Sequence, residues 1–178
     1  MVTESQADRI YVYTDASFSH QHKVGVIGFS IFSNSEKHES VLLKDNEIKL
    51  LEIREKNNIC AEFRSALVAL DSIKNAESPK SVVLFSDCQT LIGLPQRRQS
   101  LEENLFISKS KNALLANAKL YQDFFILYDK FDLECIWVKG HFRAGTLDRV
   151  HENFSYLDKA VRKQLRISVD KLEGSQIL

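Results

Sequence analysis

The stretch RIYVYTD, residues 9–15, decides the fold that we expect for this chain. Its β-branched and aromatic side chains predict a β-strand, in which even-numbered residues share one face and odd-numbered residues share the other. The last residue of the stretch, Asp15, is a carboxylate at the exit of an apolar strand. A single Asp in that position is most often a turn residue. Asp15 becomes a candidate site residue only if acidic residues from distant parts of the chain meet it.

The composition is that of one globular domain. The chain has 178 residues, of which 44% are hydrophobic and 27% are charged, as in typical soluble domains. No apolar run is long enough to span a bilayer, and the polar N-terminal segment does not resemble a signal peptide. We therefore expect a flexible lead at 1–8, one domain at 9–167 and a C-terminal tail at 168–178, with no membrane contact.

The cysteines indicate the cellular compartment, and the distribution of charge bears on the kind of partner. Cys60, Cys88 and Cys135 are odd in number and lack the spacing of a metal site, so we expect reduced thiols in a cytoplasmic protein. We also expect a monomer. The net charge is zero, from 24 basic and 24 acidic residues, which is not the balance of a protein that coats nucleic acid. Residues 139–166 hold seven cations and three anions. This asymmetry fits a polyanionic partner, and it fits a solvated helix face equally well.

Strand and helix patterns alternate along the chain. Strands are predicted at 9–15, 23–32, 38–44, 82–85 and 133–138, and helices at 59–75, 90–94, 112–130 and 153–166. Turns or loops are predicted at 17–22, 45–57 and 96–111, with a strand extension within 45–57 as an alternative. Asn58 is the predicted N-cap of the helix at 59–75, Pro95 is expected to end the short helix before it, and Trp137 is expected in the core.

The order of these elements predicts the fold class. The helix between the third and fourth strands requires a crossover, which makes strands one and four parallel neighbours. We therefore predict an α/β fold with a five-stranded mixed sheet in the order 3-2-1-4-5, in which strand 2 is antiparallel and helices flank the sheet. Asp15 and Asp87 follow strands one and four, so both emerge at the sheet edge where open α/β sheets bind ligands.

Two further acids, Glu62 and Asp158, lie in the first turns of predicted helices. Either position alone is ordinary, because the helix dipole favours a carboxylate near a helix N-terminus. Four carboxylates that converge repel one another and raise one another's pKa unless cations lie between them. Oxygen ligands without clustered His or Cys favour Mg²⁺ or Mn²⁺, and two such ions can promote phosphodiester hydrolysis.

Five motifs in fixed order carry a family resemblance. They are YTDAS at 13–17, AEFRSALVAL at 61–70, FSDCQ at 85–89, WVKGH at 137–141 and HENFSYLDKAVRK at 151–163. Together they resemble ribonuclease H of type 1 over residues 9–166. The resemblance implies the ribonuclease H-like fold and a metal-dependent endoribonuclease, which hydrolyses the RNA strand of RNA–DNA hybrids with two Mg²⁺ ions or with Mn²⁺ as a substitute.

The resemblance also implies roles for individual residues. The metal ligands would be Asp15, Glu62, Asp87 and Asp158. His141 would assist proton transfer or product release from a loop. The substrate contacts would be Ser17, Asn58 (with Asn57 as the alternative asparagine), Gln89, Arg97, Arg98 and Lys139.

Two stretches depart from the family pattern. The turn after the first strand reads SFSHQHK, residues 17–23, where the family has glycine-rich sequence. His141 and Asp158 are separated by 158 − 141 = 17 positions, more than is usual in the family. The longer loop leaves His151 as a competitor for the histidine role and Asp148 as a weaker competitor for the fourth acid. We favour Asp158 because it opens an amphipathic helix in the family's register.

Two other function classes suit the same fold. One is a nucleic-acid-binding or scaffold protein with weak or no activity, which the altered turn and the zero net charge favour and the four acids oppose. The other is a different nuclease, either an exonuclease or a junction resolvase. The exonuclease signature pairs two acids as Asp-x-Glu on the first strand, whereas this chain has Asp15, Ala16 and Ser17 there.

Overall fold

The computed structural model describes residues 9–33, 41–73, 81–139 and 148–175. Its main sheet has five strands in the order β3-β2-β1-β4-β7. The strands are β1 (Ile10–Ser19), β2 (Val24–Phe32), β3 (Lys49–Ile53), β4 (Ser81–Ser86) and β7 (Asp132–Trp137). β2 is antiparallel to β1 and β3, whereas β4 is parallel to β1 and β7. The predicted fold class, strand order and strand directions are therefore confirmed.

The helices and a small hairpin complete the fold. The helices are α2 (Asn58–Ile73), α3 (Gln89–Ile92), α4 (Leu94–Glu103), α5 (Ala118–Lys130) and α6 (Arg149–Gly174), with a short 3-10 helix η1 at Asp45–Glu47. The hairpin pairs β5 (Ile107–Ser108) with β6 (Ala113–Leu114). Pro95 lies in the first turn of α4 and does not end a helix there, because a proline in the first turn lacks only an N–H that has no helical acceptor.

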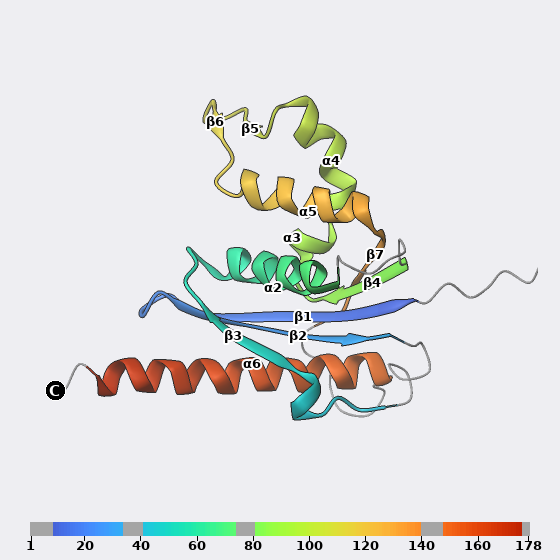
Figure 1. The fold of residues 1–178 in the computed structure, drawn as a ribbon. Coiled ribbons are helices and arrows are strands. Elements are labelled where there is room, and N and C mark those ends of the chain that lie inside the picture. The colour runs from blue at the N-terminus through green and yellow to red at the C-terminus, as the bar shows by residue number, and fades with distance from the viewer. Residues whose placement is uncertain (1–8, 34–40, 74–80, 140–147, 176–178) are drawn as a thin grey trace, which may run out of the picture.

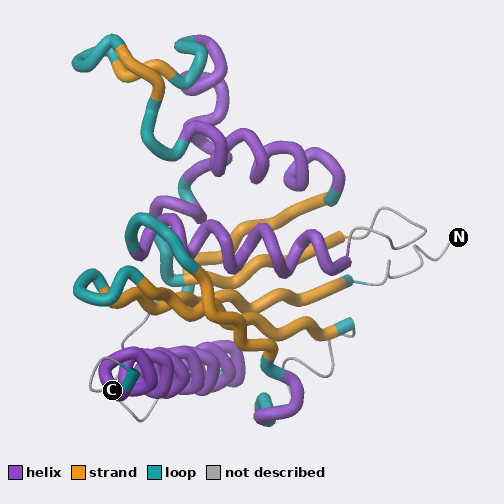
Figure 2. Tube along the Cα trace, turned by 60° about the vertical axis from the view of Figure 1, so that its left-hand side comes forward, coloured by secondary structure: helices purple, strands orange, loops and turns teal. Residues whose placement is uncertain are grey.

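The sheet separates two apolar layers (Figures 1 and 2). α2 covers one face and α6 covers the other, while α5 packs against α2 from outside. Ile10 and Val12 of β1 belong to the core on the α2 side, and Tyr11 and Tyr13 belong to the core on the α6 side. The predicted alternation along the first strand is thus confirmed, and it places Asp15 on the α6 side.

β1 is longer than the sequence predicted. Its pairing with β2 continues to Ser19 opposite Val24, so the predicted turn at 17–22 shrinks to residues 20–23. Its pairing with β4 ends earlier, at Tyr13 opposite Phe85. Asp15 therefore lies inside a strand and not at its exit, at the point where β4 has ended.

The predicted third strand at 38–44 is wrong for the part that the structure describes. Residues 41–44 are not a strand, and the third strand is β3, inside the predicted loop at 45–57; residues 38–40 lie outside the described residues. The backbone N–H of Leu43 donates to Asn153 Oδ1 of α6 at 2.8 Å. Leu43 is buried in the core on the α6 side. Its backbone hydrogen bond and its burial therefore come from a helix and not from pairing with a neighbouring strand.

Two helices differ in length from their predictions. The helix expected at 112–130 begins only at Ala118, because the β5–β6 hairpin occupies the preceding residues. The helix expected at 153–166 runs to Gly174, and Ser168 within the extension is buried. Glu173 in its last turns lies 3.1 Å from His22 Nε2 in the β1–β2 turn. The helix thus continues through the boundary predicted at residue 167, while the division into domains stays a prediction.

Among the described residues, no helix has both the length and the apolar character that crossing a bilayer requires.

Candidate metal centre

Three carboxylates from three elements converge at one edge of the sheet. Asp15 comes from β1, Glu62 from the second turn of α2, and Asp87 directly follows β4. One oxygen atom from each lies within 4.8 Å of the others. The parallel pairing of Tyr13 with Phe85 sets Asp15 and Asp87 side by side, because each acid follows its paired residue by two positions.

The fourth predicted acid faces the same pocket without joining that cluster. The pocket has a volume of about 360 Å³. It is lined by Asp15, Ala16, Ser17, Asn58, Ile59, Glu62, Asp87, Cys88, Asp158 and Arg162. Asp158 of α6 directly follows Leu157, whose side chain lies against Gly28, the residue of β2 that pairs with Asp15. A side chain at Gly28 would collide with Val161 and Leu157, so the glycine lets α6 approach the sheet here.

The N-terminus of α2 is built differently from the prediction. Asn57, not Asn58, caps the helix, because Asn57 Oδ1 accepts from the Cys60 N–H at 3.0 Å. Asn58 is thereby free to act in the pocket, where its Nδ2 donates to Glu62 Oε1 at 3.2 Å. This contact orients one carboxylate oxygen of Glu62 and leaves the other for a different partner.

Burial and mutual repulsion disfavour the charged forms of two of the acids. Desolvation raises the pKa of Asp15 well above its usual value, and the nearby charges of Asp158 and Asp87 raise it further. Desolvation likewise raises the pKa of Glu62, with the charges of Asp15 and Asp87 adding to the effect. A cation between these groups would reverse both effects, because an opposite charge favours the ionised carboxylate.

Unpartnered oxygen atoms indicate where a cation would fit. Asp15 Oδ2 and Glu62 Oε2 are buried, and neither has a hydrogen-bond partner within the described residues. A buried polar atom without a partner is costly, and native proteins rarely leave one without reason. Carboxylate oxygens with no His or Cys in the cluster suit a hard divalent cation such as Mg²⁺ or Mn²⁺. The donor set therefore fits the predicted cofactor.

The competing residues of the long loop have a structural role in the described part of α6. Asp148 is the N-cap of α6 and accepts from the His151 N–H at 3.0 Å. The ring Nδ1 of His151 also lies 2.7 Å from Asp148 Oδ1. Neither residue is among those that line the acidic pocket, and this placement favours Asp158 as the fourth acid. His141 lies outside the described residues.

The predicted substrate contacts lie in different places. Ser17 and Asn58 line the pocket, and Gln89 is exposed at the first residue of α3. Lys139 is exposed directly after Val138 at the end of the β7 segment. These positions are compatible with contact to a ligand in the pocket, and their roles stay predictions.

The two arginines of α4 differ sharply in their surroundings. Arg97 is exposed. Arg98 donates through Nη2 to Asp129 Oδ2 at 2.8 Å and through Nε to Glu102 Oε1 at 2.7 Å. Its guanidinium also lies 4.9 Å from the ring centre of Phe125. Arg98 therefore holds α4 against α5, a contact that sequence reasoning missed.

Trp137 does not lie in the core, contrary to the prediction. It is 46% exposed, because it is the last residue of β7, an edge strand of the sheet. Its indole Nε1 donates to the backbone oxygen of Asp87 at 3.2 Å. Trp137, on β7, thus fixes the peptide group of Asp87, which follows the neighbouring strand β4.

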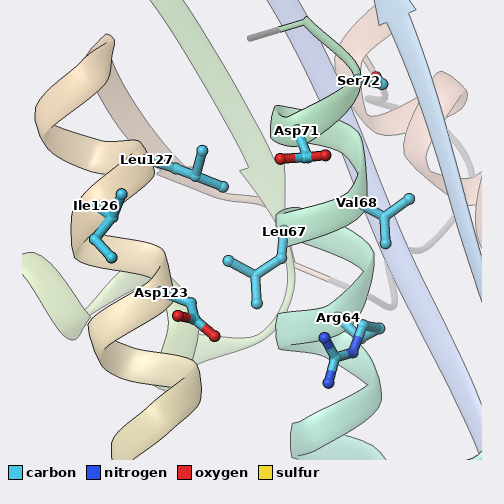
Figure 3. Close-up of a pocket in the computed structure, with 8 residues that line it drawn as sticks. All are labelled: Arg64, Leu67, Val68, Asp71, Ser72, Asp123, Ile126 and Leu127. Carbon is cyan, nitrogen blue, oxygen red and sulfur yellow. The ribbon is translucent and has the colours of Figure 1, made fainter.

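A larger and different pocket lies between α2 and α5. It has a volume of about 540 Å³, and Figure 3 shows Leu67 and Leu127 pointing towards each other across it. Asp71, Asp123 and Arg64 add charged groups to its lining. This pocket shares no lining residue with the acidic pocket, and it has no cluster of metal ligands among the described residues.

The chain is similar to known ribonuclease H proteins. The family model described as RNase H matches residues 7–166, whereas no curated protein matches the chain. LC9-RNase H1, a type 1 RNase H with the type 2 active-site motif, is 18% identical, with a TM-score of 0.63 over 87% of this chain and 71% of that chain. The N-terminal RNase H domain of rv2228c from Mycobacterium tuberculosis is 15% identical, with a TM-score of 0.58 over 92% of this chain and 99% of that chain.

A larger viral enzyme shares the fold as well. The foamy viral protease–reverse transcriptase, solved in complex with an RNA/DNA hybrid, is 14% identical, with a TM-score of 0.60. The match covers 92% of this chain and 22% of that chain. At these identities the structural similarity establishes the fold.

Proposed function

The chain belongs to the RNase H family, and from this membership and the acidic pocket we propose that it is a metal-dependent endoribonuclease acting on RNA–DNA hybrids. The observation that carries the proposal is the convergence of Asp15, Glu62 and Asp87, two of which have a buried oxygen atom without a hydrogen-bond partner in the described structure. Without a cation such a buried acidic cluster is unfavourable, because burial and mutual repulsion disfavour the charged carboxylates.

Two Mg²⁺ ions would be held by the four acids, with Mn²⁺ as a possible substitute. Asp15, Glu62 and Asp87 would hold one ion, and Asp15 with Asp158 would hold the other. When bound, the ions would activate water and stabilise the charge that develops on the phosphodiester oxygens. The products would carry 3′-hydroxyl and 5′-phosphate ends.

Neighbouring groups hold the ligands in place before any ion binds. Asn58 fixes one oxygen of Glu62, and Trp137 fixes the backbone of Asp87. The Cys88 N–H donates to Ser86 Oγ at 3.1 Å, which shapes the turn on which Asp87 lies. Such preorganisation reduces the rearrangement needed during the reaction.

Substrate selection would depend on contacts around the rim of the pocket. Ser17, Asn58 and Gln89 can donate to sugar and phosphate oxygens, including the 2′-hydroxyl that distinguishes RNA from DNA. Arg97 and Lys139 would add phosphate contacts. His141 would assist proton transfer or product release. The foamy viral relative was solved with an RNA/DNA hybrid, which supports the same class of substrate for this chain. We also propose a monomer that works in the cytoplasm.

A cleavage assay tests the proposal. A labelled RNA–DNA hybrid should be cut within its RNA strand in Mg²⁺ or Mn²⁺, and an end-blocked hybrid should be cut equally well. Loss of cleavage on end-blocking would indicate an exonuclease. A protein that binds the hybrid but is inert in both metals would be a scaffold, and the proposal would be wrong.

A further inference from the structure

Arg162 brings a positive charge into the acidic pocket. Its Nε lies 2.7 Å from Asp158 Oδ1, and the two residues are four positions apart on α6. Arg162 also lines the pocket together with Asp15. It lowers the pKa of Asp15, whereas Asp158 raises it, so both α6 side chains lie within electrostatic reach of that carboxylate.

The four acids therefore occupy two different environments. Asp15, Glu62 and Asp87 form a cluster of oxygen atoms within 4.8 Å of one another. Two of them have a buried oxygen without a hydrogen-bond partner among the described residues. Asp158 lies outside this cluster and already has a cation beside it. A metal ion shared by Asp15 and Asp158 would meet a guanidinium of the same sign of charge.

We propose that Arg162 is a resident counter-cation that competes with a divalent ion for Asp158 and makes the second metal position weaker than the position at the three-acid cluster. This inference rests on the proposed function, because it takes the acids to be metal ligands. Arg162 is then a positioning residue that acts through Asp158.

The exposure of Arg162 makes the competition reversible. Its side chain is 46% exposed, whereas that of Asp158 is 17% exposed. The guanidinium can swing into solvent when an ion arrives, at the modest cost of one partly exposed ion pair. Its positive charge stays nearby in either position, so the second ion binds against repulsion. Occupancy of the second position should consequently vary with the concentration of the divalent ion.

Calorimetric titration with Mn²⁺ in the absence of nucleic acid tests this inference. In the unmodified protein we expect one tighter and one weaker site. Arg162→Met should tighten the weaker site by about tenfold, because one like charge is removed from the pocket, and should change the tighter site much less. Arg162→Lys keeps the charge and should resemble the unmodified protein.

Lys159→Met is the matched control for charge. Lys159 is exposed on the same helix and is not among the residues that line the pocket. Its replacement removes the same formal charge and should shift the weaker site by less than about twofold. Circular dichroism should show that every variant keeps the fold.

The possible outcomes separate this inference from the proposed function. Equal shifts for Arg162→Met and Lys159→Met would overturn the inference and leave the three-acid site intact. Loss of the weaker site in Arg162→Met would also overturn it, since Arg162 would then hold Asp158 in its binding position. Absence of any Mn²⁺ binding, in the unmodified protein and in the variant, would overturn both the inference and the proposed function.

Discussion

Asp15 and Asp87 lie side by side because Tyr13 pairs with Phe85 in parallel register, two residues before each acid. Their supports differ. Asp15 is 3% exposed and belongs to a strand that continues, paired with Gly28 of β2. Asp87 is partly exposed and follows the last residue of β4, where Trp137 holds its backbone oxygen. The pocket thus combines a rigid buried carboxylate with one that is accessible to a ligand.

Asp87→Asn should abolish hybrid cleavage and leave hybrid binding intact. The amide retains the shape of the side chain but loses the negative charge that a divalent ion requires. We expect kcat to fall by about 100-fold or more and the hybrid Kd, measured by fluorescence anisotropy, to stay within about threefold. Asp132→Asn, at the exposed first residue of β7, is the control and should cleave normally. Substantial cleavage by Asp87→Asn would contradict the proposed ligand set.

Asp158→Asn and Asp148→Asn should separate the two candidates for the fourth acid. Asp158 lines the pocket, whereas Asp148 caps α6. Asp158→Asn should therefore lose most of its cleavage activity. Asp148→Asn should remain active and lose less than about 1 kcal/mol of unfolding free energy, because Asn is also a good N-cap. The reverse pattern of activities would assign the role to Asp148.

In the metal-free protein, the contribution of the acidic pocket to stability should fall as the pH rises. Asp15 and Glu62 have raised pKa values in the folded state, so the folded protein holds their protons more tightly than the unfolded chain does. Their contribution is fully present below the ordinary carboxyl pKa of about 4 and is lost as the pH rises through the raised values. Urea unfolding in EDTA, from about pH 4 upwards, measures this loss of unfolding free energy.

Asp15→Asn is the variant that isolates this effect. It should flatten the pH dependence and raise the unfolding free energy at pH 8 by roughly 1–3 kcal/mol, because a buried like charge is removed. Mg²⁺ should stabilise the unmodified protein at pH 8 and have little effect on Asp15→Asn. Parallel pH profiles for the two proteins would show that the acidic cluster does not limit stability.

Arg97→Ala and Arg98→Ala should affect different properties, hybrid binding and folding stability respectively, although the residues are adjacent. Arg97 is exposed, so its loss should weaken hybrid binding and reduce the slope of log Kd against log salt by about one. Arg98 is held by Asp129, Glu102 and Phe125, so its loss should cost about 1 kcal/mol of unfolding free energy. Weaker hybrid binding by Arg98→Ala at unchanged stability would assign Arg98 to the substrate.

Gly28→Ala should destabilise the protein and impair the site together. A Cβ at this position would lie 2.3 Å from Val161 Cγ2 and 3.1 Å from Leu157 Cδ1. Moving α6 outwards would cost roughly 1–3 kcal/mol and withdraw Asp158 from the pocket. Gly174→Ala is the control, since a Cβ there would meet nothing within 4 Å. Equal melting temperatures for the two variants would show that α6 can move away from the sheet without a loss of stability.

Much of the fold was predictable because its signals are local. The alternation along RIYVYTD depends only on strand geometry, and it correctly divided Val12 and Tyr13 between the two faces. The parallel neighbours β1 and β4 follow from the helix between them. β3 was predicted only as an alternative within a loop, because it is an edge strand with mostly exposed residues and its pattern is weak. Leu43 misled the prediction because α6, not a strand, buries it.

The candidate site was predictable in part, because its residues also carry local sequence signals. Each acid stands in a recognisable motif, so Asp15, Glu62 and Asp87 could be named before their distances were known. Asn57 and Asn58 are both suitable N-caps by residue type, and only the hydrogen bonds decide between them. The pair of Asp158 with Arg162 has the i,i+4 spacing of an ordinary helix salt bridge, which gives no sign that it faces a pocket.

The sequence by itself determined the strand order of the main sheet, the two faces of β1 and the identity of the acids, because these depend on residue type and on spacing along the chain. Only the tertiary structure decided that Asp15 lies inside its strand, that Trp137 is exposed beside Asp87, and that Arg162 shares the pocket with Asp158. These features depend on where neighbouring strands end and on how closely α6 approaches the sheet. Such distances arise from packing between elements far apart in the chain, which no local pattern specifies.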